Sequence, residues 1–543
     1  MNRLLAVVLS WVLVATQLSA AESSFFGEIK APQWLHKRFY PEIVKVRDVE
    51  GIGEQIVDGK LVLKLKNFLE LVLKNSTDVN LTRLDVYTAA DQIEAAKAVY
   101  DPTVNLGFNT FRSVTPQSSQ LGGAETLSTL IQNSFVNYQQ VAPTGQTFSG
   151  GFSAARSSSN NSFNFLNPNL GSALTFTAAQ PLLRDRTNIQ RSAPIEIART
   201  QLRITSEQSE AHITDVLAAA AGQYWDAIRA RDNIGVLQQT LDLAQKSYER
   251  DRKALDLGAL ASLDIYQSQT QVAERNRDLI QAQYAYTSAL DGLRTLIGAD
   301  LTPELRKIEI VLADNPASLP SKSAILPFED ALTAALRVRP ELSAAHRRVT
   351  VDDLNARVAR NLLLPRVDLT VQAASSGLAG NQVQVGNTGL VNALGQAFGF
   401  TYPGYGAGLQ ISFPLHSKAA QAQLADALVN KTRDAYAERQ AQQRITLDVR
   451  QAINSLELAD ASIQAATLAR DLAQKNVDAE QQKYELGSIT AFEVLDSQTR
   501  LSSAESALLN ANVGYQQAYV NYQRSTAALL PGLGMVLETP KVK

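Results

Sequence analysis

The 543-residue chain contains no cysteine and only four histidines. The absence of cysteine excludes disulfides, thiolate metal sites and a cysteine nucleophile. The histidines are scattered and lack the spacing of metal ligands: His36, His212, His346 and His416. We also find no phosphate-binding loop and no Ser/His/Asp set. We therefore predict a protein that is not an enzyme and holds no metal or cofactor.

The chain also lacks an excess of charge of one sign and long apolar runs. Its formal net charge of −2 gives no field that would attract nucleic acid, so we expect no nucleic-acid partner. Beyond the N-terminus, no apolar run reaches the roughly 18 residues of a transmembrane helix. Leu4–Ala15 is apolar except for Ser10, follows Asn2-Arg3 and precedes the small residues Ser19-Ala20-Ala21. We interpret residues 1–21 as a signal peptide, the alternative being a retained membrane anchor.

What the chain does contain is an internal repeat. The segment LGALASLDIYQSQT begins at Leu257, and LGSITAFEVLDSQT begins at Leu486. Each interrupts a long helical pattern, and each long pattern begins just after a strand-like run that ends in Pro-Leu, at Pro181-Leu182 and Pro414-Leu415. The repeat predicts a duplicated unit of strands, a very long helix, a glycine turn and a return helix.

Alternation of apolar and polar residues predicts strands with one apolar face. The alternating runs are Val104–Phe108, Phe148–Ala154, Leu174–Ala178, Val367–Ala373 and Ala407–Phe413, and Asn133–Val141 also looks extended. We expect loops at about 114–130, 157–171 and 376–405. Such strands in an exported protein are typical of an outer-membrane barrel, which must close to satisfy its edges. One chain offers too few strands, so several chains must share the barrel.

The first strand region is longer than the second. Pro102 to Pro181 spans 79 residues (181 − 102), whereas Pro365 to Pro414 spans 49 (414 − 365). An extra hairpin with strands of about 10 residues would fill the difference and give six strands per chain. The alternative is four strands, with longer strands or a longer loop in the first half.

Helical spacing predicts the remaining elements. Helices are expected over 61–100, broken at Asn75–Asp78 with Thr77 or Asp78 as the second N-cap, and over 328–364. The long helices run from beyond Pro194 to Leu257 and over 418–486, and a return helix follows from Leu263. At 1.5 Å per residue the first long helix measures about 95 Å, too long for a monomeric globule.

Two heptad-like seams predict that the helices pack along their length as coiled coils. They are Ile445, Val449, Ala452, Leu456, Ala459, Ile463 and Ala466, and Leu501, Ala504, Leu508, Ala511, Tyr515, Ala518 and Tyr522.

This ordered, duplicated set resembles the outer-membrane efflux protein family, the TolC-like trimeric channels. The residues that carry the resemblance are Gln180-Pro181-Leu182-Leu183, Phe413-Pro414-Leu415, Leu257-Gly258, Tyr484-Glu485-Leu486-Gly487 and Val494-Leu495-Asp496. The resemblance implies an α+β membrane protein of the cell outer membrane with a large periplasmic portion. Long antiparallel coiled coils form a periplasmic tunnel, and strands join a shared trimeric β-barrel in outer-membrane lipid. Family members usually contribute four strands per chain.

The implied function is that of an outer-membrane channel in a tripartite efflux pump or a type I secretion system. A periplasmic adaptor and an inner-membrane transporter are the implied partners of the homotrimer, and the family has no catalytic activity. An exported coiled-coil scaffold or adhesin is the alternative, but it does not explain the strands at matching places in both halves.

Together the sequence patterns and the resemblance divide the chain into segments, of which the N-terminal extension and the C-terminal tail receive no role. The segments are a signal peptide (1–21), an N-terminal extension (22–60), periplasmic helices (61–102 and 326–364), barrel strands (103–183 and 365–415), long helical hairpins (184–298 and 416–529), a connector (299–325) and a C-terminal tail (530–543).

Two candidate sites follow from matching residues. The first is the pair of turns at the ends of the long helices, where family members meet the adaptor: Leu257, Gly258, Ala259 and Leu260, and Leu486, Gly487, Ser488 and Ile489. The alternative is a plain helix C-cap with glycine in the left-handed conformation.

The second candidate site is the periplasmic gate. Glu493 and Asp496 match the acidic residues that ring the closed aperture in the family, and they lie three apart on one helix face. Such a ring selects cations, whereas the alternative is a solvated helix face. Asp264 and Tyr484 match two residues that link the coiled coils, while Ile489 replaces a basic residue common in the second turn. That replacement predicts a weaker lock.

Overall fold

The computed structural model describes residues 45–117, 125–257, 264–320, 325–382, 386–486 and 488–535. The chain divides into two units, Met1–Asp48 and Val49–Lys543. The predicted signal peptide and most of the N-terminal extension lie outside the described residues, so the fold is that of the second unit.

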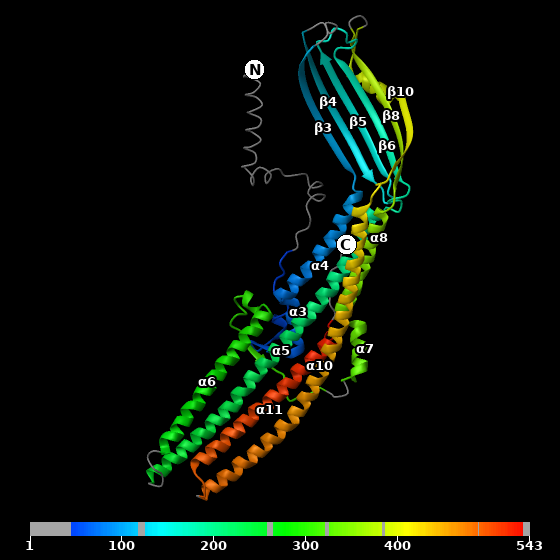
Figure 1. The fold of residues 1–543 in the computed structure, drawn as a ribbon. Helices are drawn as coiled ribbons and strands as arrows, with labels where there is room; N and C mark the ends of the chain where they lie inside the picture. The colour runs from blue at the N-terminus through cyan, green and yellow to red at the C-terminus, as the bar shows by residue number, and fades with distance from the viewer. Residues whose placement is uncertain are drawn as a thin grey trace. The chain divides into compact units, whose positions relative to one another are not determined.

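Six long antiparallel strands form one sheet in the order β10-β8-β6-β5-β4-β3 (Figure 1). Their bounds are β3 Thr103–Pro116, β4 Thr126–Val141, β5 Thr147–Ser159, β6 Asn169–Pro181, β8 Arg366–Gln382 and β10 Tyr402–Ser412, and the short β9 Gly386–Thr388 pairs with β8. The hairpin β4–β5 is the additional pair that the surplus of residues in the first half predicts. In the described part of one chain the sheet is open, with β3 and β10 at its edges.

The expected loops are shorter than the sequence suggested. Strand β3 continues to Pro116 and β4 begins at Thr126, so much of the loop expected at 114–130 is strand. Within the third expected loop, 376–405, β8 continues to Gln382 and the helix α9 occupies Leu390–Phe398. These polar and glycine-rich stretches show too little alternation to be recognised as strands from the sequence. They form strands because their main chains hydrogen-bond to the neighbouring strands.

The strand register places the alternating apolar residues on one face. Leu106 lies opposite Val136, Val136 opposite Phe152, and Phe152 opposite Leu174. Because side chains alternate along a strand, all of these residues project from the same side of the sheet. We call this side the apolar face.

Two helical hairpins make up most of the remainder: α5 Ile189–Asp256 with α6 Asp264–Leu296, and α10 Lys418–Glu485 with α11 Ala491–Ser525. The helices α5 and α10 each have 68 residues, which corresponds to about 100 Å. The helix α5 begins five residues before Pro194 and not beyond it, as the sequence suggested. Pro194 lies in the second turn, where proline removes one main-chain hydrogen bond, and the helix nevertheless continues through it.

The predicted seams are buried where α10 meets α11. Ile445, Val449, Ala452 and Leu456 of α10 pack with Tyr515 and Tyr522 of α11 in one apolar cluster. A second face of α11 packs against α5, with Val513 and Val520 in the larger core cluster. The helix α11 therefore joins the two hairpins.

The shorter helices are α3 Leu65–Asn75, α4 Thr77–Lys97, α7 Phe328–Val338, α8 Pro340–Leu362 and α12 Leu529–Leu533, with 3-10 turns at Gly53–Gln55, Ala98–Tyr100 and Ala299–Leu301. The N-cap of α4 is Ser76 and not Thr77 or Asp78, and it makes no side-chain capping bond. No helix among the described residues has the length and apolarity needed to cross a bilayer.

A small sheet that the sequence did not reveal clamps the middle of α5. It comprises β1 Ile56–Val57, β2 Lys60–Leu63 and β7 Glu309–Leu312, so residues 61–63 are strand and not helix. The Tyr224 hydroxyl of α5 lies 3.0 Å from the Leu63 carbonyl and 2.8 Å from Oδ2 of Asp314. Arg231, two turns further along, donates to the Leu312 carbonyl at 2.5 Å. Residues of the connector thus hold α5 near its midpoint.

Candidate functional site

At one end of the first hairpin α5 ends at Asp256 and α6 begins at Asp264, and at the same end of the second α10 ends at Glu485 and α11 begins at Ala491 (Figure 1). Gly258, Ala259, Leu260 and Gly487 lie outside the described residues. Leu257 and Leu486, which correspond in the repeat, are each 85% exposed. Ser488 folds back, its main-chain nitrogen donating to the Lys483 carbonyl at 3.0 Å. Both turns therefore present a leucine to solvent, and Ile489 beside the second is half-buried.

Glu493 and Asp496 lie at the start of α11, three residues apart as expected. Glu493 completes a capping box: its Oε2 accepts a hydrogen bond from the Thr490 main-chain nitrogen at 3.0 Å. Asp496 pairs with Arg500 on the next turn, with 2.8 Å between Oδ2 and Nη2. Each carboxylate thus has a partner on its own helix, and negative charge at this end of α11 also suits the helix dipole.

Tyr484, near the end of α10, contacts α5 and thereby links the two hairpins. Its hydroxyl lies 3.4 Å from Oδ1 of Asp251, and the Arg250 guanidinium lies over its ring, 4.2 Å from the centroid. Burial, together with the Asp251 carboxylate, raises the pKa of the Tyr484 hydroxyl. Asp264 is the first residue of α6, and its side chain is outside the described part of the structure.

Sequence reasoning missed Asp251, which is 1% exposed and accepts a hydrogen bond from the Ser268 hydroxyl as well. A signal was available, because Asp251 and Ser268 lie nearly equally far from the turn and so face each other in an antiparallel hairpin. The second repeat lacks this link. Ser497, the counterpart of Ser268, bonds to the Val494 carbonyl, and Glu480, the counterpart of Asp251, pairs with Lys483. The buried carboxylate belongs to the first hairpin alone.

Further polar contacts tie the hairpins together away from the turns. The hydroxyls of Thr240 on α5 and Ser502 on α11 lie 2.9 Å apart, and both side chains are buried. Arg275 of α6 donates to the Thr499 hydroxyl of α11 at 2.9 Å. Opening the bundle at this end would break these bonds as well as the contact of Tyr484.

Comparison with known proteins identifies relatives of more than half of the chain. The family profile described as "Outer membrane efflux protein" matches residues 147–299 and 331–528. The toluene efflux pump outer membrane protein TtgC of Pseudomonas putida is 24% identical over 333 residues, 59% of this chain and 62% of that protein. Outer membrane protein TolC of Escherichia coli is 23% identical over 345 residues, 60% of this chain and 66% of TolC. The chain thus aligns with less than two thirds of these relatives' length.

Solved structures share the fold over more of the chain. A crystal structure of CusC has a TM-score of 0.64 at 18% identity and covers 86% of this chain and 92% of its own. The CmeC outer membrane channel of Campylobacter jejuni has a TM-score of 0.61 at 14% identity and covers 92% and 95%. At such identities the likeness shows the fold: long helical hairpins joined to a sheet.

Proposed function

The chain belongs to the outer membrane efflux protein family, and on that premise we propose that it forms the outer-membrane channel of a tripartite efflux pump or a type I secretion system. Family membership places it in the cell outer membrane with a large periplasmic portion. In the proposal, substrates enter from a periplasmic adaptor and an inner-membrane transporter and leave through the channel to the exterior. The proposal includes no catalytic step.

The observation that carries the proposal is the open sheet joined to paired helices of about 100 Å. The edge strands β3 and β10 each pair on one side only in the described part of the chain. An open edge cannot stand in lipid, because nothing there satisfies its backbone groups. Pairing β10 of one copy with β3 of the next removes both edges, and three copies of six strands make a barrel of eighteen.

The ends of the helical hairpins are the proposed docking sites for the adaptor. The exposure of Leu257 and Leu486 supports this role, because apolar anchors at a surface are typical of interaction sites. The remaining turn residues, Gly258, Ala259, Leu260, Gly487, Ser488 and Ile489, belong to the proposal through their place in the same turns. The proposed gate lies beside them and comprises Glu493, Asp496, Asp264 and Tyr484, to which we add Asp251.

Assembly and conduction test the proposal together. In mild detergent we expect the mass of a trimer, because the sheet edges and the long helices need partners. On gels without heating, the outer-membrane fraction should migrate differently from a boiled sample. In a planar bilayer the purified protein should conduct ions. A monomer that conducts would contradict the shared barrel, and a trimer that never conducts would favour the scaffold.

A further inference from the structure

The helix α9, Leu390–Phe398, packs on the sheet near the ends of β6 and β8. Its own residues Ala393 and Ala397 are fully buried. The Ser172 hydroxyl of β6 donates to the Ala393 carbonyl at 2.6 Å, and the Phe398 ring stacks on Phe152 with 5.4 Å between centroids. The helix therefore contacts three strands of the sheet: β5, β6 and β8.

The glycine at position 377 makes this docking possible. A Cβ atom built on Gly377 of β8 would lie 1.9 Å from the Ala393 carbonyl oxygen, inside any permitted contact distance. No other residue type fits beneath the helix without moving it. The close approach of α9 to the sheet therefore depends on a glycine at position 377 of β8.

The register shows which face of the sheet α9 covers. Gly377 lies opposite Ser172 in the ladder, two residues along from the pair of Ser375 with Leu174. Leu174 in turn lies opposite Phe152. Because residues two apart on a strand share a face, α9 lies on the apolar face and not on the opposite, polar face.

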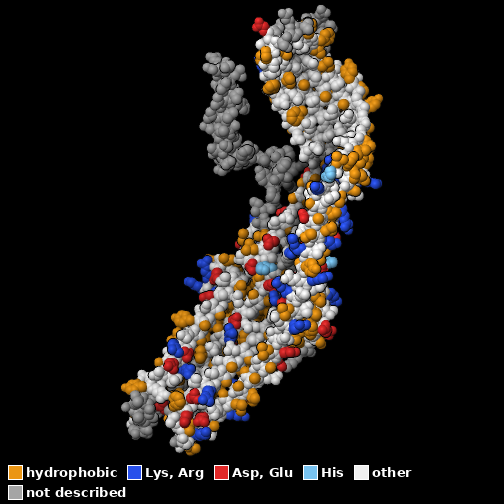
Figure 2. All heavy atoms as spheres, viewed as in Figure 1, with side chains coloured by type: hydrophobic (Ala, Val, Ile, Leu, Met, Phe, Trp, Pro, Cys, Tyr) orange, Lys and Arg blue, Asp and Glu red, His pale blue; other side chains and the backbone are white. Residues whose placement is uncertain are grey.

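The apolar face of strands in an outer-membrane protein meets lipid, so a helix packed on it is also surrounded by lipid. The composition of this region agrees. No Asp, Glu, Lys or Arg occurs between Asp368 and Lys418. Along α9, Val391 is 80% exposed, and Phe398 is still 59% exposed although its ring stacks on Phe152. Charged side chains gather over the helical hairpins and are sparse over the sheet (Figure 2).

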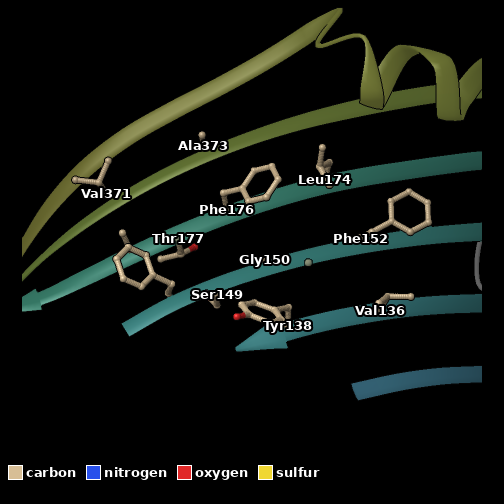
Figure 3. Close-up of a pocket in the computed structure, with 13 residues that line it drawn as sticks. Val136, Tyr138, Ser149, Gly150, Phe152, Leu174, Phe176, Thr177, Val371 and Ala373 are labelled. Atoms are coloured by element: carbon tan, nitrogen blue, oxygen red, sulfur yellow. The ribbon is translucent and has the colours of Figure 1, made fainter. Parts of the chain in front are cut away.

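Beside α9 the apolar face is hollowed. A cavity of about 570 Å³ is lined by Val136, Phe148, Phe152, Leu174, Phe176 and Val371 among others (Figure 3). Phe152 belongs both to this hollow and to the stack with Phe398, so the helix and the hollow are adjoining parts of one surface. That surface is continuous with the strands that face the membrane.

We propose that α9 lies in the outer membrane on the lipid side of the barrel wall, with Leu390, Val391 and Phe398 among the acyl chains, and that a lipid acyl chain occupies the adjoining hollow. The proposal rests on the proposed function only in that it requires the sheet to be the wall of a membrane barrel. It adds a lipid-binding surface that the channel function does not itself require.

The absence of cysteine makes a direct test possible, because a single introduced cysteine carries the only label. We would attach a nitroxide at Val391→Cys and at Ala373→Cys, which lines the hollow. Two matched controls are Leu106→Cys on the apolar face of β3 and Asn137→Cys on the opposite face of β4. The trimer is placed in vesicles of phosphatidylethanolamine and phosphatidylglycerol, and relaxation by oxygen is compared with relaxation by a water-soluble nickel chelate.

We expect the ratio of oxygen to nickel relaxation at Val391→Cys and Ala373→Cys to match that at Leu106→Cys. It should exceed the ratio at Asn137→Cys about tenfold, because oxygen concentrates among acyl chains and the polar face borders water. The inference is wrong if the relaxation ratio at Val391→Cys equals that at Asn137→Cys while the ratio at Leu106→Cys is that of a lipid-exposed site. In that case α9 lies in water. Shielding from both reagents would mean that another protein copy covers α9, which also overturns it. If Leu106→Cys itself reads as water, the sheet is not a membrane wall and the proposed function fails with it.

Discussion

At the scale of single residues, Asp251 is the most consequential side chain near the proposed gate. It is buried, it is bonded by Ser268 within its own hairpin, and it faces Tyr484 of the other hairpin. A buried carboxylate is costly unless it is bonded, so separating the hairpins would leave Asp251 with one partner fewer. The contact therefore favours the closed arrangement of the two hairpins.

We predict that Asp251→Asn and Tyr484→Phe each raise the resting conductance of the channel in planar bilayers. Loss of one hydrogen bond to a charged group corresponds to about 1.5–3 kcal/mol, enough to change the population of a closed state at least tenfold. Glu480→Gln is the matched control, since Glu480 is the counterpart of Asp251 in the repeat but, among the described residues, pairs with the nearby Lys483 on its own helix. Equal conductance in all three variants would remove Asp251 from the gate.

At the scale of elements, the pairing of α8 with α10 contains a carboxylate that the fold does not neutralise. Asp352 of α8 is 9% exposed, and its Oδ2 has no hydrogen-bond partner among the described residues. Burial, followed by the nearby carboxylate of Asp434, raises the pKa of Asp352 to about 6. The adjacent Asp353 differs, because Lys431 holds its pKa below the usual range through an ion pair of 2.7 Å.

The sign of the resulting pH dependence follows from linkage. The pKa of Asp352 is higher in the folded than in the unfolded chain, so its charge destabilises the fold fully above about pH 6 and progressively less as the pH falls toward about 4. We predict that Asp352→Asn raises the thermal unfolding midpoint by about 2 °C near pH 7.5, with a smaller gain near pH 5. Calorimetry of the purified protein in detergent measures both midpoints.

Asp353→Asn is the control for this pair, because it removes a carboxylate that Lys431 already neutralises. It should not raise the midpoint at either pH. A gain for Asp352→Asn that was independent of pH would mean that packing and not charge is responsible.

The elements that could be predicted from sequence are those with long, regular patterns. The seam from Ile445 to Leu456 repeats often enough to fix a coiled coil, and the 30-residue surplus of the first half predicted the hairpin β4–β5. The strands β2 and β7 have four residues each, too few to show the two-residue alternation of a strand. Their pairing also joins segments about 250 residues apart in the sequence. The helix α9 depends on Gly377, which has no meaning until the strand and the helix are brought together.

The candidate site was only partly accessible to sequence reasoning for a similar reason. The positions of Glu493 and Asp496 follow from the repeat, but their engagement with Thr490 and Arg500 depends on where α11 begins. The role of Asp251 depends on which residues face each other across the turn. Local spacing indicates the helix face, whereas pairing across helices requires the fold.

At the scale of the whole assembly, three copies would bring six carboxylates of Glu493 and Asp496 to one aperture. Three copies of Arg500 would accompany them, since each pairs with Asp496. The aperture should therefore be less negative than the carboxylates alone imply. We still expect a cation preference, because the Glu493 carboxylates have no basic partner among the described contacts.

We predict that the variant with both Glu493→Gln and Asp496→Asn loses most of its cation selectivity and its block by divalent cations added from the periplasmic side. Glutamine preserves the capping box, so α11 should keep its start and the trimer its mass. Reversal potentials and block in planar bilayers provide the measurement. Arg500→Gln should act in the opposite direction and increase cation selectivity, so an unchanged selectivity in both variants would place the filter elsewhere.

The clamp on α5 has a mechanical consequence for this assembly. Tyr224 and Arg231 are held by the connector, and Leu257 lies more than 25 residues beyond them, about 40 Å along the helix. A rod fixed near its middle acts as a lever with its fulcrum at the fixed point. A small rotation of α5 at that point produces a larger displacement at Leu257. The part of α5 before Tyr224 must then rotate in the opposite direction or bend. A rotation of α5 about this point would therefore displace the proposed gate, at the tip of the helix, much farther than the small sheet.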